Sequence, residues 1–162
     1  MFNPNWARWI MASVSNHFNT VAAAIPLPFM VDGVDEIIAE DQHTDHAELR
    51  VTGPFITEVS KDRYRFHVDV NILITDLMNE TGENAYDLQT WCGAFQVGMD
   101  GPIMVYKYGS ESGDDSAYIG CLSPRQGKYD ANKVLHYGQI NKVDRIRQSM
   151  IDGKFQMTIN ST

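Results

Sequence analysis

The fold is decided by eleven consecutive residues, Tyr64-Arg65-Phe66-His67-Val68-Asp69-Val70-Asn71-Ile72-Leu73-Ile74. Every second residue, beginning with Tyr64, is aromatic or aliphatic, and the residues between them are mostly polar. Successive side chains of a β-strand point to opposite faces, so this period of two predicts one long strand with one buried face. It is the strongest pattern in the chain.

A second strand precedes this one. Ala47, Leu49 and Val51 repeat the alternation, and Phe55, Thr57 and Val59 resume it after Gly53-Pro54. Proline cannot donate to a ladder of hydrogen bonds, so a bulge or kink is expected at Gly53-Pro54. The short connection Lys61-Asp62 then predicts a long antiparallel hairpin.

Two helices are predicted. The first runs from Trp6 to Val21 with apolar residues at every fourth position; Asn3 is a suitable cap and Pro4 suits the first turn. The prolines in Ile25-Pro26-Leu27-Pro28 end it. The second spans residues 84–96, carries Leu88, Trp91, Cys92 and Phe95 on one face, and has Asn84 or Thr81 as its expected cap.

The remaining segments predict further strands and loops. Residues 103–106 and 117–122 are expected to be strands around a polar loop at 109–116, and residues 30–46 an acidic loop or arm with a short strand. In the C-terminal third, Asp152-Gly153 is a strong two-residue turn signal, which predicts a hairpin between residues 134–150 and 154–159; residues 141–147 could also be helical.

Together these elements predict an α+β fold: an antiparallel or mixed sheet with long hairpins and two helices packed on one face. The 162 residues, 43% of them hydrophobic, suit one domain over residues 1–162 that needs no disulfide or metal to fold. Cys92 and Cys121 are far apart and are expected to be reduced thiols.

The net charge and the lack of targeting signals argue against several classes of function. The net charge is -8 and the pI about 4.9, whereas proteins that bind nucleic acids by their phosphates present basic faces. Specific DNA or RNA binding is therefore not expected, although an acidic surface would let DNA pass without sticking. The sequence begins without the basic and apolar regions of a signal peptide, and it has no run of eighteen apolar residues, so no membrane span is expected.

Two clusters could carry chemistry. Asp41-Gln42-His43-Thr44-Asp45-His46 could hold a divalent ion, but its spacing matches no metalloenzyme pattern, and a solvated acidic loop is the preferred interpretation. His67 and Asp69 share one face of the long strand and could be a base and its orienting group, but no nucleophile accompanies them. We therefore expect no catalytic residue, no metal and no cofactor. The alternative is a small ligand- or metal-binding α+β enzyme that uses His67/Asp69 or His43/His46.

Several residues are candidates for contact with another subunit. The helix face that carries Trp6 and Trp9 is expected to pack in the core. The alternative is that part of this face docks on a neighbouring subunit, because tryptophan is common at protein interfaces. The mixed polarity of the second face of the long strand also suits a partner. The candidate interface residues are Trp6, Trp9, Arg65, His67, Asp69 and Leu73.

The order of these elements resembles a known family. An amphipathic helix (Trp6 to Val21), a loop through Val31-Asp32-Gly33, a long hairpin ending in Tyr64 to Thr75, a helix from Asn84 to Phe95 and strands to the C-terminus resemble the tail terminator and related neck proteins of long-tailed bacteriophages. The resemblance covers most of the chain and rests on layout and size rather than on a specific motif.

The resemblance implies a structural virion protein. Such proteins form rings, typically hexameric, at the head-proximal end of the tail, where they end the tail tube and join it to the head. The implied partners are further copies of this chain, the tail tube protein and head-completion or neck proteins, with assembly in the host cytoplasm. DNA would slide through the ring without specific binding, and the acids Glu111, Asp114 and Asp115 are candidates for its channel. No catalytic residue carries over from the family.

Overall fold

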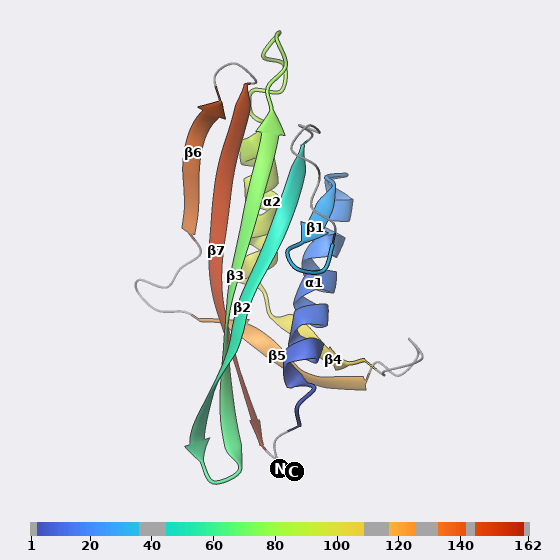
Figure 1. Ribbon diagram of the computed structural model, residues 1–162, viewed down its shortest axis with the longest axis vertical. Helices are drawn as coiled ribbons and strands as arrows, with labels where there is room; N and C mark the ends of the chain where they lie inside the picture. Colours follow the sequence, from blue (N-terminus) through green and yellow to red (C-terminus); the bar gives the residue numbers. More distant parts are fainter. Residues whose placement is uncertain (1–2, 36–44, 109–116, 126–132, 142–144, 161–162) are drawn as a thin grey trace.

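The computed structural model describes residues 3–35, 45–108, 117–125, 133–141 and 145–160. Within them it contains two helices and a curled, mixed sheet of seven strands, so the predicted α+β class is confirmed (Figure 1). In chain order the elements are α1 (Trp6–Ala24), β1 (Phe29–Val31), β2 (His46–Ser60), β3 (Arg63–Leu77), α2 (Asp87–Asp100), β4 (Ile103–Lys107), β5 (Ala117–Pro124), β6 (Lys133–Asn141) and β7 (Ile146–Asn160).

The predicted long strand, β3, lies at the centre of the sheet. It pairs antiparallel with β2 on one side and with β7 on the other, over fifteen residues from Arg63 to Leu77. The strand order is β1-β2-β3-β7-β5-β4, and β6 pairs with the N-terminal half of β7. The short β1 pairs parallel with β2 and was expected within the segment 30–46.

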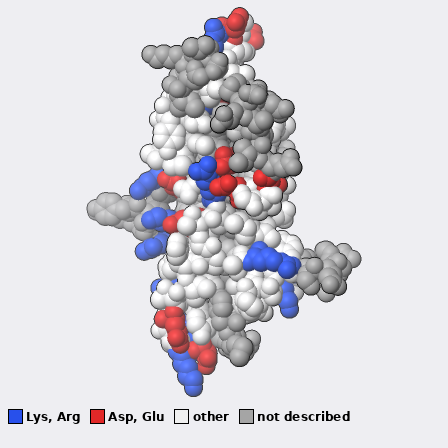
Figure 2. Space-filling model, viewed as in Figure 1, with Lys and Arg blue, Asp and Glu red and all other residues white. Residues whose placement is uncertain are grey.

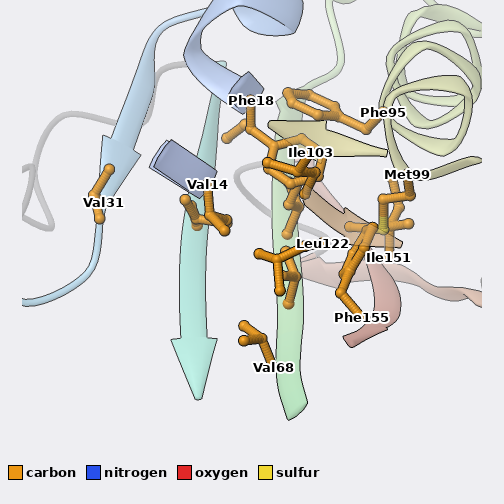
Figure 3. Close-up of a cluster of buried hydrophobic side chains, with 14 of the residues drawn as sticks. Val14, Phe18, Val31, Val68, Phe95, Met99, Ile103, Leu122, Ile151 and Phe155 are labelled. Carbon is orange, nitrogen blue, oxygen red and sulfur yellow. The ribbon is translucent and has the colours of Figure 1, made fainter. Parts of the chain in front are cut away.

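Both helices cover the same face of the sheet, as predicted (Figure 1). The alternating residues of β3 point into this layer, and five of them are completely buried. Figure 3 shows α1, α2 and the strands meeting in one core, in which Phe18 of α1 and Phe95 of α2 have ring centroids 6.4 Å apart. The buried β3 residues are Phe66, Val68, Val70, Ile72 and Ile74.

The hairpin of β2 and β3 extends beyond the core as an arm, which we define as residues 55–65 (Figure 1). Gly53 marks its start: the register between the strands shifts between Thr52 and Phe55, as the kink at Gly53-Pro54 predicted. Gly53 has a φ of 111°, and a Cβ there would lie 2.8 Å from the His67 carbonyl oxygen, so a side chain fits poorly. Beyond Tyr64, which packs against the edge of the core, the apolar residues of the arm are exposed: Phe55, Ile56 and Val59.

The C-terminal hairpin differs from the prediction. Asp152-Gly153 lies in the middle of β7, and the strands that pair are β6 and the first half of β7, so the prediction of a turn at Asp152-Gly153 was wrong. Pairing along the whole of β3 outweighs the local turn preference, because each pair adds ladder hydrogen bonds and burial. Gly153 is buried opposite Val70, and Asp152 receives a hydrogen bond from the Asn71 amide.

The predicted helix caps also differ. Helix α1 begins at Trp6 after Asn5, and the Asn3 side chain accepts a hydrogen bond from the Asn5 backbone N–H at 2.9 Å instead of capping the helix. Helix α2 begins at Asp87, three residues later than predicted. The Asn84 side chain bonds the preceding loop rather than the helix, because it donates to the Leu77 carbonyl and accepts from the Asn79 N–H.

Neither helix in the described residues is long and apolar enough to cross a lipid bilayer.

Candidate functional site

The face of the sheet opposite the helices is the largest surface on which candidate residues gather. Arg65, His67, Asp69 and Leu73 all alternate onto this uncovered face of β3, where Arg65 is exposed and the other three are half-buried. Figure 2, seen from the same side as Figure 1, shows charged groups at the arm, in a belt across the middle of the molecule and at the opposite end. The structure thus brings four of the six candidate interface residues onto one surface.

His67 and Asp69 lack the partners that a catalytic pair needs. In register, His67 lies between Phe55 and Gln156, and Asp69 lies between Thr52 and Lys154. Over the ranges that the structure describes, neither a hydrogen bond nor an ion pair joins His67 to Asp69. In the described part of the chain, the surface is an open sheet face, and no buried nucleophile lies beside the pair.

The double substitution His67→Ala with Asp69→Ala is expected to leave the fold intact, with a free energy of unfolding within about 1 kcal/mol of the wild type, because both side chains are partly solvated and neither is paired. Urea unfolding followed by circular dichroism measures this. A loss of several kcal/mol would show that the pair has a structural role not visible in its contacts.

An apolar patch that the sequence analysis missed lies beside Leu73 on the uncovered face. In register, Met150 of β7 lies opposite Leu73 and Leu135 of β6 lies opposite Met150. Leu135 and Tyr137 are 44% and 49% exposed, and the Tyr137 hydroxyl lies 3.7 Å from the Met150 sulfur. The alternation in β6 is short and is interrupted by a bulge, so no clear pattern in the sequence predicts this patch.

Two edges of the sheet are open. Strand β1 pairs with β2 only at Ala47–Leu49, so in the described structure no strand covers the outer edge of β2 from Arg50 to Ser60. Strand β6 likewise pairs only with β7 among the described strands, which leaves its other edge free. Unpaired N–H and C=O groups along an edge are a template for pairing with another chain.

Trp6 and Trp9 lie on the helix side, away from the uncovered face. Trp9 is 5% exposed, and its indole N–H donates to the Tyr108 carbonyl at 3.2 Å. Trp6 is half-buried, with its ring centroid 5.2 Å from that of Phe66 and 5.5 Å from that of Trp9. The expectation that this face packs in the core holds for Trp9, which offers little surface to a partner.

Polar groups are buried where β3 and β7 meet the start of α2. The Asp76 carboxylate is fully buried and receives hydrogen bonds from the Arg147 guanidinium, which also donates to the carbonyls of Ala85 and Asn84 at 2.7 and 3.1 Å. Burial raises the pKa of Asp76 above its ordinary value, although Arg147 opposes the shift. This group fastens the loop before α2 to the sheet.

Ser149 forms a second buried polar contact. Its hydroxyl lies 2.7 Å from Nδ1 of His136 and interacts with the Cys92 thiol, whose pKa is raised by burial and lowered to a smaller extent by Ser149. Ser149 is 0% exposed beneath α2, so no substrate can reach its hydroxyl. The contact therefore satisfies buried polar groups rather than forming a nucleophile.

The other predicted chemical residues give no site. Asp45 accepts a hydrogen bond from the Leu77 N–H at 2.8 Å, and His46 lies in β2 opposite Thr75. His43 and the acids Glu111, Asp114 and Asp115 lie outside the described residues. Among the residues that are described, no three His, Cys, Asp or Glu side chains gather in a way that could hold a metal ion.

No protein-family model matches the chain, and no curated protein matches it either.

Proposed function

We propose that this chain is a structural protein that assembles side by side into a closed ring, as the tail terminator and neck proteins of long-tailed bacteriophages do. The ring, in this proposal a hexamer, ends the tail tube and joins it to the head. Its partners are other copies of the chain, the tail tube protein and head-completion proteins, and DNA passes through it without specific binding.

The observation that supports this proposal is the pair of open sheet edges and their directions. Strand β2 is antiparallel to β3, β3 to β7, and β7 to β6, so β2 and β6 run in opposite directions. In register, β6 lies level with residues 46–50 of β2, whose outer edge carries β1, so a second copy in the same upright orientation and at the same height would place its β6 beside β1 of the first. Because β1 is parallel to β2, this pair would be antiparallel, which is the commoner kind of pairing.

Repetition of this contact is what makes a ring. The edge formed by β1 and β2 and the edge of β6 are different surfaces, so the contact is heterologous, and such contacts form rings when the rotation between copies closes. The apolar patch at Leu135 and Tyr137 adjoins the β6 edge, so its burial would add to the main-chain hydrogen bonds. The continuous sheet would then carry its uncovered face around the whole assembly.

The substitutions Leu135→Glu and Tyr137→Glu, made together, are expected to reduce the assembly to a monomer of 18.3 kDa. They bring two carboxylates into the proposed contact while replacing side chains that are already half-exposed, so folding should survive. Light scattering on a sizing column across a range of concentrations measures the mass. The wild type is expected at a closed multiple of 18.3 kDa, with six copies as the leading value.

The matched control is Val97→Glu, which adds a carboxylate at a residue that is 76% exposed on α2, a helix that packs on β3 and β7 rather than on β2 or β6. It should keep the wild-type mass, and circular dichroism should show all the variants folded. A wild-type chain that remains monomeric at every concentration, and also when mixed with its tail tube protein, would refute the ring.

A further inference from the structure

We infer that the arm of one copy docks end to end on the opposite, acidic end of a second copy. This acidic end consists of residues 77–87, which are the last residue of β3, the loop after it and the first residue of α2. Figure 1 shows the arm at the lower end of the molecule and the loop before α2 at the upper end, so one chain cannot join its own two ends. The contact runs along the long axis, whereas the proposed ring contact runs across the sheet.

On the uncovered face the arm presents unpaired positive charge, whereas its turn carries Asp62 and its other face carries Glu58. Arg63 and Arg65 are exposed on the uncovered face of β3, and His67 follows on the same face. Their cross-strand neighbours are Ser60, Thr57 and Phe55 on β2 and Asn160, Thr158 and Gln156 on β7, none of which is acidic. Over the described ranges, no ion pair engages Arg63 or Arg65, so both guanidinium groups remain available to a partner.

The arm also exposes apolar side chains. Phe55, Ile56 and Val59 are 54%, 46% and 45% exposed, and Phe55 lies beside His67. Phe55 shares the face of the unpaired arginines, whereas Ile56 pairs with Phe66 and so lies on the other face of the hairpin. An exposed aromatic residue beside arginines is a composition that is enriched at protein interfaces, where a few such residues carry much of the binding energy. Hydration of the charge accounts for the exposure of the arginine side chains, but it does not account for the exposure of the apolar side chains.

The acidic end has the complementary composition. Glu80, Glu83 and Asp87 are exposed, and residues 77–100 contain no Lys, Arg or His. Arg145, whose carbonyl accepts a hydrogen bond from the Met78 N–H, is a base beside this loop, so carboxylates still outnumber bases there. Tyr86 is 80% exposed at the same end, next to Asp87.

The acidic end is also held in a fixed shape. Arg147 donates to the carbonyls of Ala85 and Asn84, and the Asn84 side chain bonds both Asn79 and Leu77. A surface that is already ordered loses less entropy when it binds. Arg63 and Arg65 could then pair with carboxylates by two parallel hydrogen bonds each, and Phe55 could pack on Tyr86.

This inference goes beyond the proposed function, because an axial contact would join one ring to another. It is tested with two charge reversals in the full chain. The arm variant combines Arg63→Glu with Arg65→Glu, and the end variant combines Glu80→Lys with Glu83→Lys. Sedimentation velocity at low salt is expected to show axial association of the wild type that is at least about tenfold stronger than that of either variant, because like charges then face each other.

Mixing the two variants is the decisive measurement. The reversed arm of one then meets the reversed end of the other, so the mixture should associate as the wild type does. A control, Lys107→Glu, reverses an exposed base outside the arm and should behave as the wild type. A mixture that associates no better than its separate components would overturn the inference.

The same data separate the two proposals. If the wild type is a closed ring whose mass the arm variant leaves unchanged, the axial contact is refuted and the ring stands. If the wild type forms open chains that the arm variant reduces to 18.3 kDa, the ring is refuted and the axial contact stands. A photoreactive benzoyl-phenylalanine in place of Phe55 should capture residues 77–87 of a second copy; capture confined to any other region would also overturn the axial contact.

Discussion

Replacing Ile72 by Asp is expected to abolish the folded state at neutral pH. Ile72 is 0% exposed at the centre of β3, and its neighbours in register, Leu49 and Ile151, are also fully buried. The change removes apolar burial of about 2–5 kcal/mol and places a charge with no partner in the core, which costs several kcal/mol more. The total is comparable with the whole stability of a typical domain, about 5–15 kcal/mol.

The adjacent residue supplies the control. Leu73 is half-buried on the uncovered face, so Leu73→Asp should fold and lose at most about 1 kcal/mol. Circular dichroism and thermal unfolding of both variants measure the difference. The two substitutions introduce the same side chain on opposite faces of β3. Ile72→Asp protein that is native-like and unfolds cooperatively would therefore refute the assigned orientation of β3.

Replacing Arg147 by Ala is expected to destabilise the protein by about 3–5 kcal/mol at neutral pH, because the Asp76 carboxylate would remain buried without its partner. The loop before α2 would lose its anchor as well, since Arg147 donates to Ala85 and Asn84. Chemical denaturation at several pH values measures the effect. A loss below about 1 kcal/mol would mean that water replaces the guanidinium.

The loss of stability caused by Arg147→Ala is expected to depend on pH through the Asp76 carboxyl group. Burial raises the pKa of Asp76 in the folded state, and removal of Arg147 would raise this pKa further. The folded protein then binds the proton more tightly than the unfolded chain, so its stability rises as the pH falls through the folded-state pKa toward the ordinary value near 4. The loss caused by Arg147→Ala should therefore be largest at neutral pH and smaller in acid.

A double variant separates the ion pair from the packing around it. Arg147→Met with Asp76→Leu removes both charges and keeps similar volumes, and it should be more stable than Arg147→Ala alone. The two residues lie opposite each other in register, so their effects are not expected to add. Additive losses would mean that Asp76 and Arg147 act separately.

The sequence by itself determined the elements with long and regular patterns. The alternation from Tyr64 to Ile74 specified β3 and its buried face, because a side chain in a strand can only point to one face or the other. The spacing of apolar residues specified both helices and their packing side in the same way. Gly53-Pro54 marked the kink in β2, since a proline interrupts the ladder wherever it falls.

Only the tertiary structure decided the C-terminal third and the surfaces. Asp152-Gly153 favours a turn locally, yet pairing with β3 keeps β7 extended through it, and this pairing involves residues about eighty positions apart. Asp76 and Arg147 meet for the same reason, and no spacing in the sequence announces their contact. The open edges of β2 and β6, the exposed arm and the acidic end likewise follow from which strands find partners. Strand pairing is a contact between distant segments, and local patterns do not encode it.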